Sequence, residues 1–296
     1  MAEQLDLFLD SRAVQRANDV VAALLARDSA RATETFSALV GEAPAYPGLA
    51  EFAALIQSLD SADVKPRANA AIDARLVALD RVTAPAAHRM LGERAKGFVD
   101  AFVRDMALTA DALAFDPRYP GAHAASLWLR CAEYERAEAA AAKVDVTPPD
   151  PNVLHWLSVS RNRLRGIAAA RPTFFALCLN HPMQVDALRL ELADALLDRD
   201  WAGFSKETAS WFVADDELPR WFPAWYLLRH AAAASDFEGM EFSGQAAAEA
   251  VRLLLRILPL ERARDLRPLA ALRQRLRDTH ESFFALYMTD RTVRHT

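Results

Sequence analysis

The sequence predicts an all-α fold, an array of antiparallel helical hairpins. Apolar residues recur every three or four positions through nearly the whole chain, which is the period of an amphipathic helix. The alternation of apolar and polar residues that is typical of strands is almost absent. Only 9 Gly and 15 Pro occur in 296 residues, too few for a disordered or fibrous protein. These observations favour short helices that bury one another in pairs.

The first two predicted helices form a hairpin. Apolar residues between positions 13 and 25 fall on one helical face. Asp10 and Ser11 are both good N-cap residues, so we expect the first helix to begin there. Asp28 interrupts the pattern and opens a second helix, which we expect to run to Val40.

The same periodicity continues along the rest of the chain. A third helix carries the apolar residues of 49–59, and a fourth begins near Pro66, because proline is favoured in a first helical turn. Brief turns join the helices, so each helix is expected to pack against its neighbours in the sequence. Further helices are predicted around 84–93, 95–114, 121–131, 134–145, 152–165, 173–179, 183–198, 201–213, 222–234, 243–258 and 268–287.

The length of the chain permits one extended or two compact domains, since 52% of its residues are hydrophobic and can bury a large core. We expect an N-terminal segment over residues 1–10 and a helical-repeat domain over 11–296. Within that domain we allow for two sub-arrays that meet near 146–151.

Residues 115–151 resemble a tetratricopeptide unit, a helical hairpin that stacks into an α-solenoid. The matching residues are Pro117, Trp128, Tyr134, Ala137 and Pro149. The departures are Gly121, Ala124, Ala125, Ala132 and Ala141, where the motif prefers larger side chains or glycine. A looser echo occupies 180–212. The resemblance covers about a third of the chain and implies a tetratricopeptide-like α-solenoid, a type of fold more than a function.

Four aromatic residues surround Pro223. They are Trp221, Phe222, Trp225 and Tyr226, which is more than one buried helical stripe needs. They could bridge two helical layers, or they could form an apolar surface patch of the kind that marks a binding site. We favour the bridging role.

Motifs for catalysis or metal binding are missing from the sequence. The 7 His are widely scattered, and no HExxH, GxSxG or glycine-rich phosphate loop occurs. The 2 Cys, Cys131 and Cys178, lack metal-ligand spacing, and we expect both to be buried apolar residues in a protein from a reducing compartment. We therefore expect no catalytic residue, no metal and no cofactor, and predict that the chain is not an enzyme.

Positive charge is concentrated in two stretches. Residues 151–185 and 251–296 together carry +9, whereas the whole chain carries −5, so the remainder carries −14. Two pairs of Arg are spaced to share helix faces and could follow phosphates or pair with acidic helices: Arg161 with Arg165, and Arg252 with Arg256. Because the total charge is negative, we expect weak direct binding to nucleic acid or none.

The first residues contain the pentapeptide QLDLF. It resembles the motif with which bacterial replication and repair proteins dock on the sliding clamp, and it agrees at every position. The resemblance implies an extended peptide in which Gln4 makes polar contacts while Leu5, Leu7 and Phe8 enter an apolar cleft. Alternatively, these residues continue an i, i+4 apolar series that runs through Leu9 into the first helix, and they pack on their own domain.

The preferred hypothesis is a bacterial, cytoplasmic, non-enzymatic scaffold that binds protein partners. QLDLF would recruit it to a complex of DNA replication, repair or a mobile element by binding the sliding clamp. The alternative is an all-helical enzyme or a nucleic-acid-binding accessory protein with a dispersed site. No apolar run approaches the roughly 20 residues of a bilayer span, and the N-terminus is acidic, so we expect no membrane segment.

Overall fold

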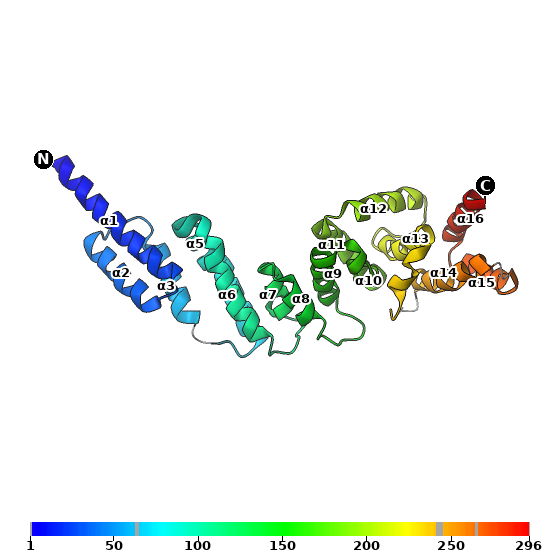
Figure 1. The fold of residues 1–296 in the computed structure, drawn as a ribbon, viewed down its shortest axis with the longest axis horizontal. Helices are drawn as coiled ribbons and strands as arrows, with labels where there is room; N and C mark the ends of the chain where they lie inside the picture. Colours follow the sequence, from blue (N-terminus) through cyan, green and yellow to red (C-terminus); the bar gives the residue numbers. More distant parts are fainter. Residues whose placement is uncertain (1, 63–64, 241–244, 264–265, 296) are drawn as a thin grey trace. The chain divides into compact units, whose positions relative to one another are not determined.

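The computed structural model describes the backbone of residues 2–62, 65–240, 245–263 and 266–295, and the side chains of the same ranges apart from 2–11, 266 and 292–295. Helices occupy most of this backbone and none of it forms a strand, which confirms the all-α prediction (Figure 1). None of these helices combines the length and the apolar character that a bilayer crossing requires.

The chain divides into two compact units, Met1–Ala140 and Ala141–Thr296. This division falls a few residues before 146–151, where we allow for two sub-arrays to meet.

The first unit contains the elements α1 to α8, most of which pack against a neighbour in the sequence. Such pairs are α1 with α2, α2 with α3, α5 with α6, and α6 with α7. Helix α3 also packs against α5. The elements are α1 (Ala2–Leu25), α2 (Ser29–Glu42), α3 (Leu49–Ala62), α4 (Asn69–Ala78), the π-turn η1 (Leu79–Thr83), α5 (Ala84–Leu91), η2 (Gly92–Arg94), α6 (Ala95–Ala110), η3 (Pro120–Ala122), α7 (Ala124–Arg130) and α8 (Tyr134–Ala141).

Capping explains some of the helix starts in this unit but not all. The Asp28 carboxylate accepts a hydrogen bond from the Arg31 amide, so α2 begins where the sequence predicts. Helix α1 begins before Asp10, because the apolar i, i+4 series continues upstream of that residue. Helix α4 begins three residues after Pro66, which is buried outside it.

The segment that resembles a tetratricopeptide unit forms α7 and α8. Tyr134 opens α8 as predicted. Trp128 and Ala137 are buried, and the Arg136 guanidinium lies 4.6 Å from the centre of the Trp128 ring. The small side chain of Ala137 is therefore in the core, where the motif places it.

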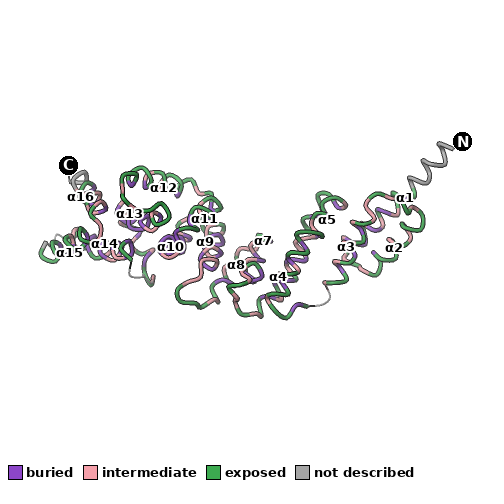
Figure 2. Tube along the Cα trace, turned by 180° about the vertical axis from the view of Figure 1, so that it is seen from behind, coloured by how far each residue is buried: buried purple, intermediate pink, exposed green. Residues whose placement is uncertain are grey.

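The second unit contains α9 to α16, and consecutive helices again pack together, as do α9 with α10, α14 with α15, and α15 with α16. Buried residues line most of α10 and α13, which pack against each other (Figure 2). The elements are α9 (Pro151–Arg165), α10 (Ile167–Asn180), η4 (Pro182–Gln184), α11 (Val185–Leu192), α12 (Ala195–Thr208), η5 (Leu218–Trp221), α13 (Phe222–Arg229), η6 (Ala231–Phe237), α14 (Ala246–Ala263), α15 (Leu266–Thr279) and α16 (Glu281–His295).

Three predicted helices of this unit are each divided in the structure. The helix expected over 222–234 ends as α13 at Arg229, and the 3-10 helix η6 follows it. The helix expected over 183–198 breaks at Ala193, which has a left-handed backbone with φ of 48°. The Asp194 carboxylate then accepts hydrogen bonds from the amides of Leu196 and Leu197 and starts α12. The helix expected over 268–287 breaks at His280, whose Nδ1 accepts from the amide of Phe283.

Candidate functional site

The predicted docking peptide, residues Gln4, Leu5, Leu7 and Phe8, lies outside the residues whose side chains the structure describes. Its role in binding a sliding clamp therefore stays a prediction from the sequence.

The aromatic residues around Pro223 do not form a surface patch. Trp221, Phe222, Trp225 and Tyr226 each expose at most 6% of their surface. The Phe222 ring contacts rings from α10 and α12, and Trp221 packs against the ring of His280 at 4.3 Å. The cluster thus bridges helical layers, as favoured above, and its role is to hold the core together.

The two predicted pairs of basic residues lie on different helices. Arg161 and Arg165 are on α9, which packs against α10 and α11, whereas Arg252 and Arg256 are on α14, which packs against α13 and α15. Arg252 forms an ion pair with Glu249 at 3.0 Å. These contacts favour a surface of paired charges over a continuous track for phosphates.

Both cysteines are buried, as predicted. Burial raises the pKa of the thiols of Cys131 and Cys178, most strongly at Cys178, so neither is an activated nucleophile. In the part of the chain that the structure describes, no three His, Cys, Asp or Glu side chains gather in a way that could hold a metal ion.

A buried polar cluster joins three helices of the second unit. The Tyr287 hydroxyl on α16 donates to the Glu261 carboxylate on α14, and Arg273 on α15 donates to the Tyr287 oxygen at 2.6 Å. Arg291 approaches the second Glu261 oxygen at 3.1 Å. Burial, reinforced by Glu261, raises the pKa of Tyr287 to about 12. These contacts tie α14, α15 and α16 together, which is a structural role.

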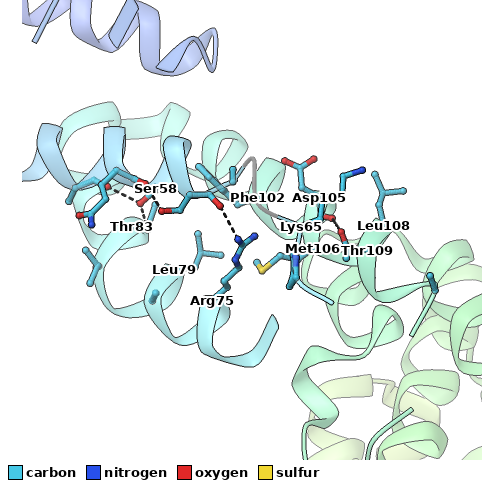
Figure 3. Close-up of a pocket in the computed structure, with 18 residues that line it drawn as sticks. Ser58, Lys65, Arg75, Leu79, Thr83, Phe102, Asp105, Met106, Leu108 and Thr109 are labelled. Carbon is cyan, nitrogen blue, oxygen red and sulfur yellow. Dashed lines mark hydrogen bonds between the residues drawn. The ribbon is translucent and has the colours of Figure 1, made fainter. Parts of the chain in front are cut away.

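The first unit contains an open groove of about 700 Å³ between α3, η1 and α6 (Figure 3). Carbon atoms make up most of its surface. Leu79 of η1 and Phe102 and Met106 of α6 form a nearly buried floor. The remaining apolar lining consists of Ala54, Ala62, Pro66, Ala78, Val82, Leu108 and Ala112.

The edges of the groove carry large apolar side chains that water reaches. Val82 on η1 is 52% exposed and Leu108 on α6 is 59% exposed. In an amphipathic helix such residues normally lie on the buried face. Their position on the outer face is the sequence signal that could have pointed to this groove.

The hydroxyl groups of the groove are engaged with one another or with the backbone. The Ser58 and Thr83 hydroxyl oxygens are 2.8 Å apart, and Ser58 also donates to the Ala54 carbonyl at 2.8 Å. Thr109 donates to the Asp105 carbonyl at 3.0 Å. These groups are therefore satisfied without a ligand.

Two of the three charged side chains in the lining also have described partners. Arg75 donates to the Ser61 carbonyl at 2.9 Å, which ties α4 to α3 (Figure 3). The Asp105 carboxylate pairs with Arg27 of the turn after α1 at 2.6 Å, and that guanidinium also lies 4.7 Å from the centre of the Phe102 ring. Lys65 is exposed and forms no ion pair with any described residue.

The described residues of the lining include neither His nor Cys. The groove can therefore bury apolar groups and attract one negative charge. The sequence did not place this groove, because its walls come from residues between 54 and 112 that are adjacent only after folding. A comparison of the chain with models of known protein families, with curated proteins and with solved structures found no match.

Proposed function

We propose that the chain is a non-enzymatic interaction scaffold, a helical array whose first unit receives an apolar segment of a protein partner in the groove between α3, η1 and α6. The observation that carries the proposal is a pair of half-exposed apolar side chains, Val82 and Leu108, at the edges of a groove with an apolar floor. An exposed apolar surface of this kind on a folded protein is typical of an interaction site.

The chemistry of the groove favours binding over catalysis. Catalysis requires polar groups that converge on one position and differ in their pKa values. Here Ser58 and Thr83 satisfy each other, and Asp105 is held by Arg27. The tetratricopeptide-like segment in α7 and α8 fits the same proposal, because arrays of helical hairpins commonly present surfaces to partners.

Affinity capture with crosslinking tests the scaffold, using extracts of cells that make the protein. Val82→Asp places a charge on the groove edge, and Val77→Asp is the matched control, because Val77 is 42% exposed on α4 and does not line the groove. We expect wild type and Val77→Asp to retain a partner that Val82→Asp loses. A partner profile that is the same for all three proteins would contradict a role for the groove.

QLDLF supports a second, separate proposal, recruitment to a bacterial sliding clamp in the cytoplasm. Leu7 and Phe8 supply apolar groups and Gln4 a polar one, in the order of the clamp-binding motif. Replacing Leu7 and Phe8 together by Ala should abolish binding in a calorimetric titration of the clamp and leave the melting temperature nearly unchanged. Loss of stability without any clamp affinity in the wild type would instead indicate an N-terminus packed on its own domain.

A further inference from the structure

The floor of the groove needs no polar group from whatever fills it. Leu79, Phe102 and Met106 offer carbon atoms, and the nearby hydroxyls of Ser58 and Thr83 are bonded to each other. A polar occupant would lose its hydrogen bonds to water without replacement. The part of the occupant that faces the floor is therefore apolar.

The length of the groove indicates the shape of the occupant. Val82 of η1 and Leu108 of α6 are both more than half exposed. Figure 3 places Leu108 at the opposite end of the groove from Thr83, the residue next to Val82. An α-helix that lies along the groove presents side chains at i, i+3 or i+4, and i+7 on one face, so it can cover both exposed side chains while that face meets the floor.

The charge of the lining indicates the charge of the occupant. Asp105 is neutralised by Arg27 at 2.6 Å, whereas Lys65 is exposed and has no ion pair with a described residue. Figure 3 places Lys65 at the end of the groove where Asp105, Met106 and Leu108 lie, opposite the Ser58–Thr83 pair. A carboxylate at the Lys65 end would therefore be attracted, and an ammonium or guanidinium repelled.

We infer that the groove binds an acidic amphipathic helix of a protein partner, with apolar side chains at positions i, i+3 or i+4, and i+7 on the floor and a Glu or Asp beside Lys65. This inference rests on the proposed scaffold function and names its partner by its chemistry. The apolar face supplies the affinity, and the carboxylate selects the sign of charge and the orientation.

The probe is a synthetic fluorescent peptide of about 16 residues, long enough to form a helix, with Leu at the helical spacing and Glu on its flanks. Two matched peptides accompany it: one carries Lys in place of Glu, and the other has the acidic composition in shuffled order. Fluorescence anisotropy measures binding to the full chain. We expect the acidic helix to bind at least about tenfold more tightly than either matched peptide.

Three variants locate the binding. Val82→Asp and Leu108→Asp should each lower the affinity for the acidic peptide at least about tenfold, while Val77→Asp should leave this affinity unchanged. Lys65→Glu should weaken binding of the acidic peptide and strengthen binding of the Lys peptide. A purely structural defect would not produce this reversal. Circular dichroism melts confirm that the variants, whose changed residues are all exposed, remain folded.

Several outcomes would overturn the inference. One is a shuffled peptide that binds as tightly as the acidic helix. Another is an affinity for the acidic helix that does not change in Val82→Asp and Leu108→Asp. Binding of a fatty carboxylate such as palmitate, with no binding of the acidic helix, would assign the groove to a lipid-like ligand. Tight binding of a QLDLF peptide instead would assign it to a second copy of this chain. If a partner is captured in a Val82-dependent manner but the acidic helix does not bind, the scaffold proposal survives and this inference fails.

Discussion

Phe222 is the residue whose removal should destabilise the second unit most directly. Its side chain is fully buried, and its ring lies 4.8 Å from that of Trp201, 5.5 Å from that of Phe204 and 5.9 Å from that of Phe174, measured between ring centres. These neighbours come from α10 and α12, so Phe222 on α13 joins three helices. Truncation to Ala would leave a cavity with walls of rigid rings that cannot collapse into it.

The expected magnitude follows from this enclosure. Replacing a buried Phe by Ala typically costs about 3–5 kcal/mol, and less when the surroundings can relax. Because the walls around Phe222 are aromatic and belong to three helices, we expect Phe222→Ala to lower the free energy of unfolding by about 4–5 kcal/mol. Phe222→Leu keeps most of the volume and should cost about 1–2 kcal/mol.

Urea unfolding followed by circular dichroism and tryptophan fluorescence measures these changes, since Trp201 and Trp225 report on the same core. Because the chain has two compact units, the free energy of unfolding should be taken from the transition that the fluorescence follows. Phe212→Ala is the matched control, because the Phe212 side chain is fully exposed and its loss should change stability by less than about 0.5 kcal/mol. A Phe222→Ala effect below about 1 kcal/mol, or one no larger than that of Phe212→Ala, would refute the reasoning.

Three further predictions concern pH and capping. Burial lowers the pKa of His280 from 6.5, so the unfolded chain binds the proton more readily than the folded chain. The free energy of unfolding should therefore be highest above pH 6.5 and fall below it. His280→Asn keeps a capping acceptor and should reduce that fall, as measured by urea midpoints at several pH values. The pKa of Tyr287 is raised from 10.0 to about 12, so the contribution of this residue to stability should be complete below pH 10 and disappear as the pH rises toward 12. Thermal melts of Tyr287→Phe should lack this alkaline loss. An alkaline profile identical to that of the wild type would contradict this role of Tyr287. Asp194→Ala removes the acceptor for two amides of α12 and should cost about 0.5–2 kcal/mol in chemical unfolding, whereas Asp194→Asn should be nearly neutral.

Local signals in the sequence were sufficient to predict most helices. The Asp28 cap and the apolar period placed α2 and α3 within a few residues of their observed bounds. The break between α11 and α12 was missed, because Ala193 adopts a left-handed backbone that usually marks Gly or Asn. Asp194 was a visible capping signal there, but a continuous apolar pattern outweighed it.

The candidate site could not be predicted in the same way. A helical period identifies which side chains face inward, but it does not determine which helices leave space between them. The aromatic cluster around Phe222 was predictable as core, because four large rings in six residues can all be buried only where several helices meet. The groove depends on where α3, η1 and α6 lie relative to one another, which the helical period of each element does not determine.

The π-helix η1 is an irregular element of the fold, and it lines the proposed binding site. It interrupts the helical run from α4 to α5, and it supplies Leu79 to the floor, Val82 to the edge and Thr83 to the bonded hydroxyl pair. A π-turn adds a residue to one turn of helix and shifts the side chains that follow, and such turns often occur at functional sites. In a regular helix an apolar side chain would be expected to turn toward the core, yet Val82 remains half exposed at the groove edge. The fold thus keeps an apolar edge open to solvent, which is unfavourable for an isolated chain and would be relieved by the partner that we propose.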